Sequence, residues 1–279
     1  MFALRVDIDS RYGLMHGVPN ILAILKDCGI KASFAAVMGG ESGIADLLRY
    51  RGGERGLMGG SRLPLSDRVR MALMPVNFAQ EQKPILEEIM RQGHTLGVHG
   101  WKHRLWTRAL DSIDVSTHVR MATEKYAALF GRRPSHFVAP GFRSGSAVLE
   151  ALDEQGYALA SDLPGEAPFR PVVGGKQFKC VQVPVTLKAA DTSPLTEHYA
   201  AQGIPDAETA RRICDEVLAR ENAGRLSTLY AHDVFEGTFR PKLLEAVLKS
   251  VCNAGIELTT FEALAERGKN NEVQYSFDK

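Results

Sequence analysis

Short apolar runs of strand length and longer amphipathic runs take turns along the chain. Residues 2–8 (FALRVDI) form a short apolar-rich run, whereas in 17–29 (GVPNILAILKDCG) apolar residues recur three and four positions apart, as on one face of a helix. The predicted strands are 2–8, 30–37, 94–100, 135–141, 157–162, 179–185, 225–233 and 256–260. The predicted helices are 17–29, 83–93, 115–131, 146–156, 206–224, 239–255 and 261–268.

Strand and helix alternate seven or eight times, and most predicted helices end in a glycine, which suits a left-handed helix cap. Such alternation predicts an α/β fold with a parallel sheet, and a closed or nearly closed barrel arranges this many strands economically. An open doubly wound sheet is the alternative, but no GxGxxG motif follows the first strand. No repeat or linker divides the chain, so we expect a single domain over 1–279.

The amino-acid composition limits the binding partners and the cellular compartment that can be expected for this protein. The net charge is +1 with 24% charged residues, which provides no overall field for nucleic acid, and we expect no nucleic-acid partner. The four cysteines contain no CxxC pair, so we expect reduced thiols. Charged residues interrupt the first apolar run, and no stretch of about 18 apolar residues occurs, so neither a secretory signal nor a membrane span is predicted. These features favour a cytoplasmic location.

Titratable side chains follow several predicted strands at the point where each ends. In parallel barrels the chemistry gathers at this carboxyl-terminal edge. Because side chains alternate along a strand, Asp7 and Asp9 are expected to point the same way from the first strand. The other candidates at the edge are His99, His103, Arg143, Asp162 and His232.

The segment HGWKH places His99 and His103 four residues apart, so that both imidazoles can reach one ion. Two imidazoles and one carboxylate form a set that leaves positions open for water and substrate. Asp9 or Asp7 would supply the third ligand. The sequence therefore predicts a divalent metal site, and zinc, cobalt, manganese or nickel all suit these ligands.

The remaining groups have roles in amide hydrolysis at such a site. The aspartate that does not bind the ion can accept a proton from the attacking water. His232 can protonate a leaving amine. We expect Arg143 and Asp162 to pair and hold the base in place, with contact between Arg143 and an anionic substrate as the alternative.

At these residues the sequence resembles the polysaccharide deacetylases, carbohydrate esterase family 4. The motifs that carry the resemblance are VDIDS, HGWKH, APGFR and LYAH, although the arginine follows the proline in APGFR, unlike in the family. The resemblance implies a distorted (β/α)7-type barrel and a divalent ion bound by Asp9, His99 and His103. It also implies that Asp7 is the catalytic base and His232 the catalytic acid.

Within this family, the stretches RVDIDSRYGLMHGVPNIL, GVHGWKHRLW, SDLPGEAPFRP, VQVPVTL and AHDVFEG resemble a deformylase branch. That resemblance implies removal of formyl from 4-deoxy-4-formamido-L-arabinose on undecaprenyl phosphate, in lipid A modification. We expect four residues near the motifs to contact the substrate: Trp101, Phe142, Arg170 and Glu236. The alternatives are an N-deacetylase of an amino sugar or polysaccharide, a cyclic-amide hydrolase, and a metal-free sugar-binding protein.

A basic and apolar insertion interrupts the alternation at about 47–76. It interleaves six arginines with leucine and methionine and contains only two acidic residues. Such a segment suits the headgroup region of a membrane. We therefore expect peripheral contact with the inner face of the inner membrane, the alternative being a barrel-covering loop with solvated arginines.

Overall fold

The structure is a computed structural model that describes residues 1–40, 64–73 and 76–277. Its centre is a seven-stranded parallel sheet with the order β8-β5-β4-β3-β2-β1-β9. These strands are β1 (Phe2–Ile8), β2 (Ser33–Ala36), β3 (Thr95–Val98), β4 (His136–Phe137), β5 (Leu159–Ala160), β8 (Val181–Gln182) and β9 (Ser227–His232). The expected distorted barrel of parallel strands and helices is confirmed.

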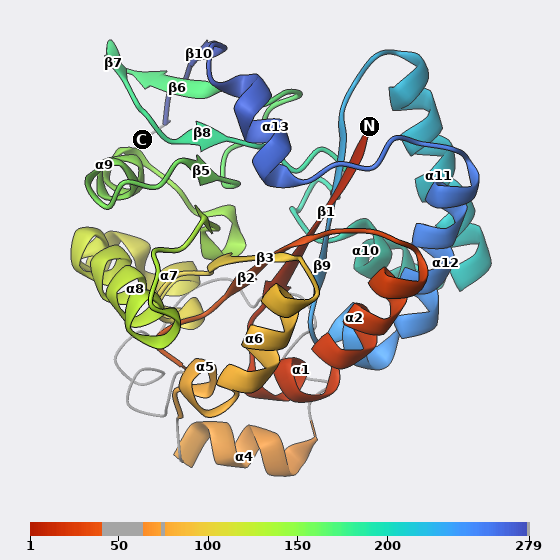
Figure 1. Ribbon diagram of the computed structural model, residues 1–279, viewed down its shortest axis with the longest axis horizontal. Coiled ribbons are helices and arrows are strands. Elements are labelled where there is room, and N and C mark those ends of the chain that lie inside the picture. Colours follow the sequence, from red (N-terminus) through yellow and green to blue (C-terminus); the bar gives the residue numbers. More distant parts are fainter. Residues whose placement is uncertain (41–63, 74–75, 278–279) are drawn as a thin grey trace.

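Helices surround the curved sheet in Figure 1. The α-helices are α1 (Arg11–His16), α2 (Val18–Asp27), α4 (Leu65–Leu73), α5 (Phe78–Glu81), α6 (Lys83–Arg91), α7 (His103–Ala109), α8 (Val115–Phe130), α9 (Ser146–Glu154), α10 (Leu195–Ala201), α11 (Asp206–Asn222), α12 (Pro241–Asn253) and α13 (Phe261–Gly268). Three short helical turns are η1 (Leu110–Ser112), η2 (Pro140–Phe142) and η3 (Phe235–Phe239).

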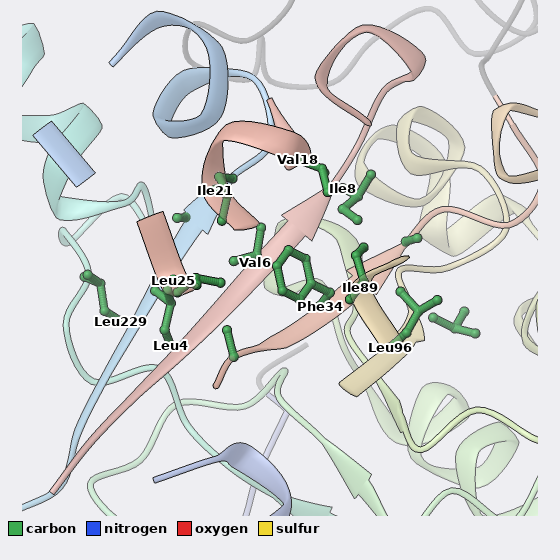
Figure 2. Close-up of a cluster of buried hydrophobic side chains, with 14 of the residues drawn as sticks. Leu4, Val6, Ile8, Val18, Ile21, Leu25, Phe34, Ile89, Leu96 and Leu229 are labelled. Carbon is green, nitrogen blue, oxygen red and sulfur yellow. The ribbon is translucent and has the colours of Figure 1, made fainter. Parts of the chain in front are cut away.

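Strand β1 separates an apolar outer layer from a polar barrel interior. Its outward side chains Leu4, Val6 and Ile8 pack in the main core with side chains from α2 and the neighbouring strands, as Figure 2 shows. Burying one such side chain contributes about 1.5–3 kcal/mol. Arg5 and Asp7 alternate with these residues, so they lie on the opposite face and inside the barrel.

The amino-terminal end of the barrel is closed by α13. Its side chains Phe261, Leu264 and Ala265 form a second buried cluster with residues of β1, β5 and β8. From the same helix, Glu262 pairs with the buried His136 of β4 at 3.2 Å. The opposite, carboxyl-terminal end therefore remains for the site.

The chain after β8 closes the remaining gap in the sheet. A parallel bridge joins Leu187 to Leu229 of β9, and the Leu187 N–H donates to the Thr228 carbonyl at 2.9 Å. A separate small sheet has the order β10-β6-β7. Its strands are β6 (Arg170–Val173), β7 (Lys176–Gln177) and β10 (Glu272–Gln274).

The predicted insertion at 47–76 falls largely outside the described residues, but helix α4 belongs to it. This helix exposes Leu65, Val69 and Leu73, with 72%, 48% and 65% of their surfaces accessible. A spacing of four places the three on one face of the helix. None of the helices in the described ranges combines the length and the apolar character needed to span a membrane.

Candidate active site

Three potential metal ligands converge at the carboxyl-terminal end of the central strands. Asp9 follows β1, His99 follows β3, and His103 begins α7. His99 Nε2 lies 3.1 Å from Asp9 Oδ1, and His103 Nε2 lies 3.6 Å from the same oxygen. One potential ligand atom from each residue lies within 4.8 Å of the other two. The donor set therefore fits a single divalent ion.

The backbone around these residues orients the two imidazoles. His99 Nδ1 lies 3.0 Å from the Val138 carbonyl oxygen, so an N–H at Nδ1 can donate there and leave Nε2 toward Asp9. Gly100 has φ +70° and lets the chain turn between the two histidines. Burial lowers the pKa of His103 to about 4, which keeps it in the neutral form that binds metal.

Charge balance at this cluster also favours a cation. Burial alone would raise the pKa of Asp9, but His103 and His99 lower it well below its usual value. Burial opposes a charge on His99, yet Asp7 and Asp9 raise its pKa above the ordinary value. Asp9 thus favours positive charge beside it, which a bound divalent ion would supply in place of a proton on the histidines.

Asp7 is held by a residue that the sequence reasoning missed. The buried Arg5 guanidinium lies 2.8 Å from Asp7 Oδ2 and also donates to Ser161 Oγ (2.9 Å) and the Ser161 carbonyl (2.7 Å). The same guanidinium stacks over Phe142 and Tyr230, 4.7 and 5.0 Å from their ring centroids. The signal was present in the sequence, because residues two apart on a strand share a face.

The expected pairing of Arg143 with Asp162 is wrong. Arg143 donates to the Thr107 carbonyl at 2.8 Å and lies 3.4 Å from Asp111, on the outer side of η2. The alternative role of Arg143 in binding an anionic substrate has no support from these contacts. Because η2 turns sharply after β4, the guanidinium is carried away from the base, and Arg5 occupies the position expected for it.

Asp162 lies buried at the end of β5, as expected from its position in the sequence. Its Oδ1 accepts the Ala139 N–H at 2.5 Å, while Oδ2 has no hydrogen-bond partner among the described residues. Burial raises the pKa of Asp162 to about 7. Asp162 therefore favours its protonated form more than an exposed aspartate does, and it anchors the loop after β4 rather than pairing with an arginine.

His232 ends β9 and points toward the predicted metal ligands, with Nε2 4.0 Å from Asp9 Oδ2. Its Nδ1 lies 2.5 Å from Glu197 Oε1, a partner that the sequence reasoning missed. Burial opposes a charge on His232, but Glu197 raises its pKa well above the usual value. The Glu197 carboxylate thus favours the protonated form of His232, which lies next to Asp7 in the register of β9 with β1.

Glu236 supports His232 instead of facing the open site. Its Oε2 accepts the His232 backbone N–H at 2.7 Å, and its Oε1 accepts the Thr196 hydroxyl. Potential ligand atoms of Glu197, His232 and Glu236 also lie close enough together to hold a metal ion. Because both oxygens of Glu236 accept protein hydrogen bonds and the carboxylate is buried, this cluster is a hydrogen-bond network around the histidine. The expected contact of Glu236 with sugar is therefore not supported.

Asp233 is a further buried carboxylate beside the site. It accepts the Ser10 N–H at 3.3 Å and so holds the turn that follows Asp9. The carboxylate packs so closely on Gly13 that an added Cβ there would lie 2.2 Å from it. Burial and the nearby Asp9 raise the pKa of Asp233 well above its usual value.

The other expected sugar contacts differ in their positions. The Phe142 ring packs edge-on against Tyr230 near Asp7. The Phe142 backbone N–H donates a hydrogen bond to the Ala139 carbonyl. Trp101 lies between His99 and His103 in the sequence. Its side chain is half-buried and packs on Gly39. Arg170 belongs to the small sheet, which lies at the end of the molecule opposite α1 in Figure 1. The structure thus keeps Phe142 and Trp101 near the site and places Arg170 away from it.

Comparisons with known proteins identify the family and the fold of this chain. A relative from Shewanella sediminis (strain HAW-EB3), named "Probable 4-deoxy-4-formamido-L-arabinose-phosphoundecaprenol deformylase ArnD", is 28% identical over 202 residues, which are 67% of this chain and 63% of the relative. Solved structures named as polysaccharide deacetylases share the fold. The one from Mycobacterium smegmatis has a TM-score of 0.69 at 16% identity, covering 100% of this chain and 93% of that one. The one from Pseudomonas aeruginosa PAO1 has a TM-score of 0.68 at 14% identity, covering 95% of this chain and 89% of that one.

Residues 6–160, more than half of the chain, match the polysaccharide deacetylase family, and the chain belongs to that family.

Proposed function

We propose that this protein is a metal-dependent amide hydrolase that removes the formyl group from 4-deoxy-4-formamido-L-arabinose carried on undecaprenyl phosphate, in lipid A modification. The observation that carries the hydrolase proposal is the cluster of Asp9, His99 and His103, with Asp7 and His232 nearby. The substrate proposal takes its support from the name of the Shewanella relative.

In this proposal Asp9, His99 and His103 hold the ion, and Asp7 is the base. A divalent ion here would polarise the amide carbonyl and lower the pKa of a water molecule. Asp7 accepts the proton of that water as it attacks the carbonyl carbon. Arg5, itself held by Ser161, fixes the Asp7 carboxylate inside the barrel, so that Asp7 stays oriented toward the reacting atoms.

His232 is the acid in this proposal. Glu197 holds its Nδ1, so Nε2 faces the ligand cluster with a proton to donate. Cleavage of the C–N bond leaves an amine on the sugar that must gain this proton as formate departs. A histidine whose pKa is raised by a carboxylate remains charged at neutral pH and suits that step.

The same proposal includes peripheral contact with the membrane that contains the lipid carrier. Its support is the apolar face of α4, where Leu65, Val69 and Leu73 are exposed side by side. In Figure 1 this helix lies at the same end of the molecule as α1, which follows Asp9. Apolar side chains on an exposed amphipathic helix can enter the headgroup region of a bilayer. Replacing the three residues with glutamine should therefore abolish co-sedimentation with anionic vesicles without changing hydrolysis of a soluble substrate.

Amine release from formylated and acetylated 4-amino-4-deoxy-L-arabinose tests the reaction directly. We expect the formyl substrate to be hydrolysed faster, and Asp7→Asn to abolish turnover while the ion remains bound. Preference for the acetylated sugar would support an N-deacetylase instead. Absence of amine release from both sugars, with one ion bound per chain, would overturn the proposal.

A further inference from the structure

We propose that Lys188 binds the phosphate of a phosphate-linked sugar substrate, an assignment that rests on the proposed amide hydrolysis at this site. Lys188 lies between β8 and α10, one residue after the bridge from Leu187 to Leu229 of β9. That bridge brings the segment alongside the strand that carries Tyr230 and His232. The lysine therefore belongs to the wall of the barrel near the site.

Aromatic contacts connect the ammonium group to the reacting residues. Lys188 Nζ lies 5.8 Å from the centroid of Phe142, and the Arg5 guanidinium that holds Asp7 lies 4.7 Å from the same centroid. Phe142 packs edge-on against Tyr230, and Tyr230 packs edge-on against His232, with centroids 5.2 and 5.3 Å apart. Lys188 is thus one ring away from the arginine that holds the base.

Arg5 and Lys188 both stack on Phe142, but they differ in whether a carboxylate pairs with their charge. Arg5 is committed to Asp7 in a buried ion pair. Among the residues that the structure describes, no carboxylate oxygen lies within 4.0 Å of Lys188 Nζ. Lys176, the other lysine that stacks on an aromatic ring, has Glu150 at 3.2 Å. Lys188 therefore keeps its charge available for a ligand.

The site needs such a cation if its substrate is an anion. Its other charged groups are mostly carboxylates, and they would repel a phosphate: Asp7, Asp9, Asp162, Glu197 and Glu236. Arg143, the guanidinium that the sequence suggested for an anion, is turned to Thr107 and Asp111. An ammonium group is a compact point charge that binds phosphate well. Lys188 has the charge and the position for the phosphate, while the amide lies at the predicted ion.

The test compares two substrates that differ in the phosphate. One is the formamido sugar linked through a phosphodiester to a short alkyl chain, and the other is its uncharged methyl glycoside. We expect Lys188→Met to lower the ratio of kcat/KM for phosphodiester over glycoside about 10-fold, mainly through KM, since a charge-assisted hydrogen bond is lost. Lys188→Arg should retain most of the ratio. Lys176→Met, which removes a lysine of the small sheet that also stacks on a phenylalanine ring, should leave it unchanged.

Other outcomes separate this inference from the proposed function. An equal loss of kcat/KM for both substrates in Lys188→Met would mean that the lysine supports the fold or the chemistry, and would overturn the phosphate assignment. If the wild-type protein hydrolyses neither substrate, the proposed function fails on its own. Lys188 is then judged by calorimetry with the phosphodiester, where equal affinity of wild type and Lys188→Met overturns the assignment and weaker binding by the variant supports it.

Discussion

The guanidinium of Arg5 lies 2.8 Å from the carboxylate of Asp7, two residues further along the same buried strand. The strand itself thus supplies both the proposed base and the cation that orients it. The arginine is also fixed by Ser161 on β5's carboxyl-terminal side and by two aromatic rings. Such a pair is costly to break, because removal of one partner leaves the other charged and buried.

Replacing Arg5 should therefore impair both stability and turnover. We expect Arg5→Met to lower the free energy of unfolding by about 3 kcal/mol and to lower kcat about 100-fold, or some 2.7 kcal/mol. Arg5→Lys should recover part of kcat, because an ammonium group can still reach Asp7. Urea unfolding and steady-state kinetics measure the two effects, and metal analysis checks that the ion is still bound. A folded Arg5→Met protein with unchanged kcat would show that Asp7 does not depend on the arginine.

The ligand cluster predicts one tightly bound divalent ion per chain. His99→Ala should lower the affinity for that ion by more than the roughly 10- to 100-fold that loss of an outer partner costs. His118→Ala, on helix α8 and outside the ligand cluster, is the matched control and should bind one ion normally. Titration with zinc or cobalt after chelation measures both. Affinity should also fall as the pH is lowered, because the raised pKa of His99 makes protons compete with the ion.

The periodicity of the sequence was sufficient to predict the parallel sheet and the carboxyl-terminal edge at which the site residues lie. It predicted strands before Asp9, His99 and His232, and parallel order then brings their ends together. The run 256–260 was predicted as a strand, but only a single bridge from Leu258 to Phe2 forms there. Strands β6, β7 and β10 were not predicted, because they form a separate small sheet outside the alternation of strand and helix.

The contacts between side chains of the site were harder to predict than the residues that belong to it. Glu197 meets His232 across 35 residues, and only the path of the chain after β8 brings them together. Arg143 was misplaced because the direction of η2 depends on a left-handed Gly141, with φ +63°, that no periodicity encodes. Arg5, in contrast, was within reach of strand geometry alone.

Removing the carboxylate of Glu197 should shift the pH dependence of turnover. Glu197 raises the pKa of His232, so in the wild type the acid keeps its proton to a higher pH than it would without that carboxylate. In Glu197→Gln that pKa falls, because the carboxylate that favours the charged imidazolium is gone. The alkaline limb of kcat/KM should move to lower pH, while the rate at acidic pH changes less. Glu208→Gln, at a half-buried residue of α11 that pairs with Arg211 and Arg212, is the control. An unshifted limb in Glu197→Gln would argue against His232 as the acid.

The ion pair at the closed end of the barrel predicts a pH-dependent stability that is separate from catalysis. Burial alone would raise the pKa of Glu262, but its hydrogen bond to His136 and the charge of that histidine lower it from 4.5 to about 2. A lowered carboxyl pKa adds stability that is complete above pH 4.5 and is lost as the pH falls to about 2. The shift corresponds to at most about 3 kcal/mol, because each pKa unit is worth about 1.4 kcal/mol.

Glu262→Gln should therefore reduce the free energy of unfolding at pH 6 and flatten its dependence on pH between 4.5 and 2. Urea unfolding at a series of pH values, on the protein with the ion removed, measures this slope without interference from metal release. Glu266→Gln changes an exposed glutamate of the same helix that pairs only with Lys269 among the described residues, and should keep the wild-type slope. Equal slopes for wild type and Glu262→Gln would mean that His136 and Glu262 do not form an ion pair in solution. In that case α13 would be held by the apolar contacts of Phe261, Leu264 and Ala265 and by the Ser33 hydroxyl, which donates to Glu262 at 3.0 Å.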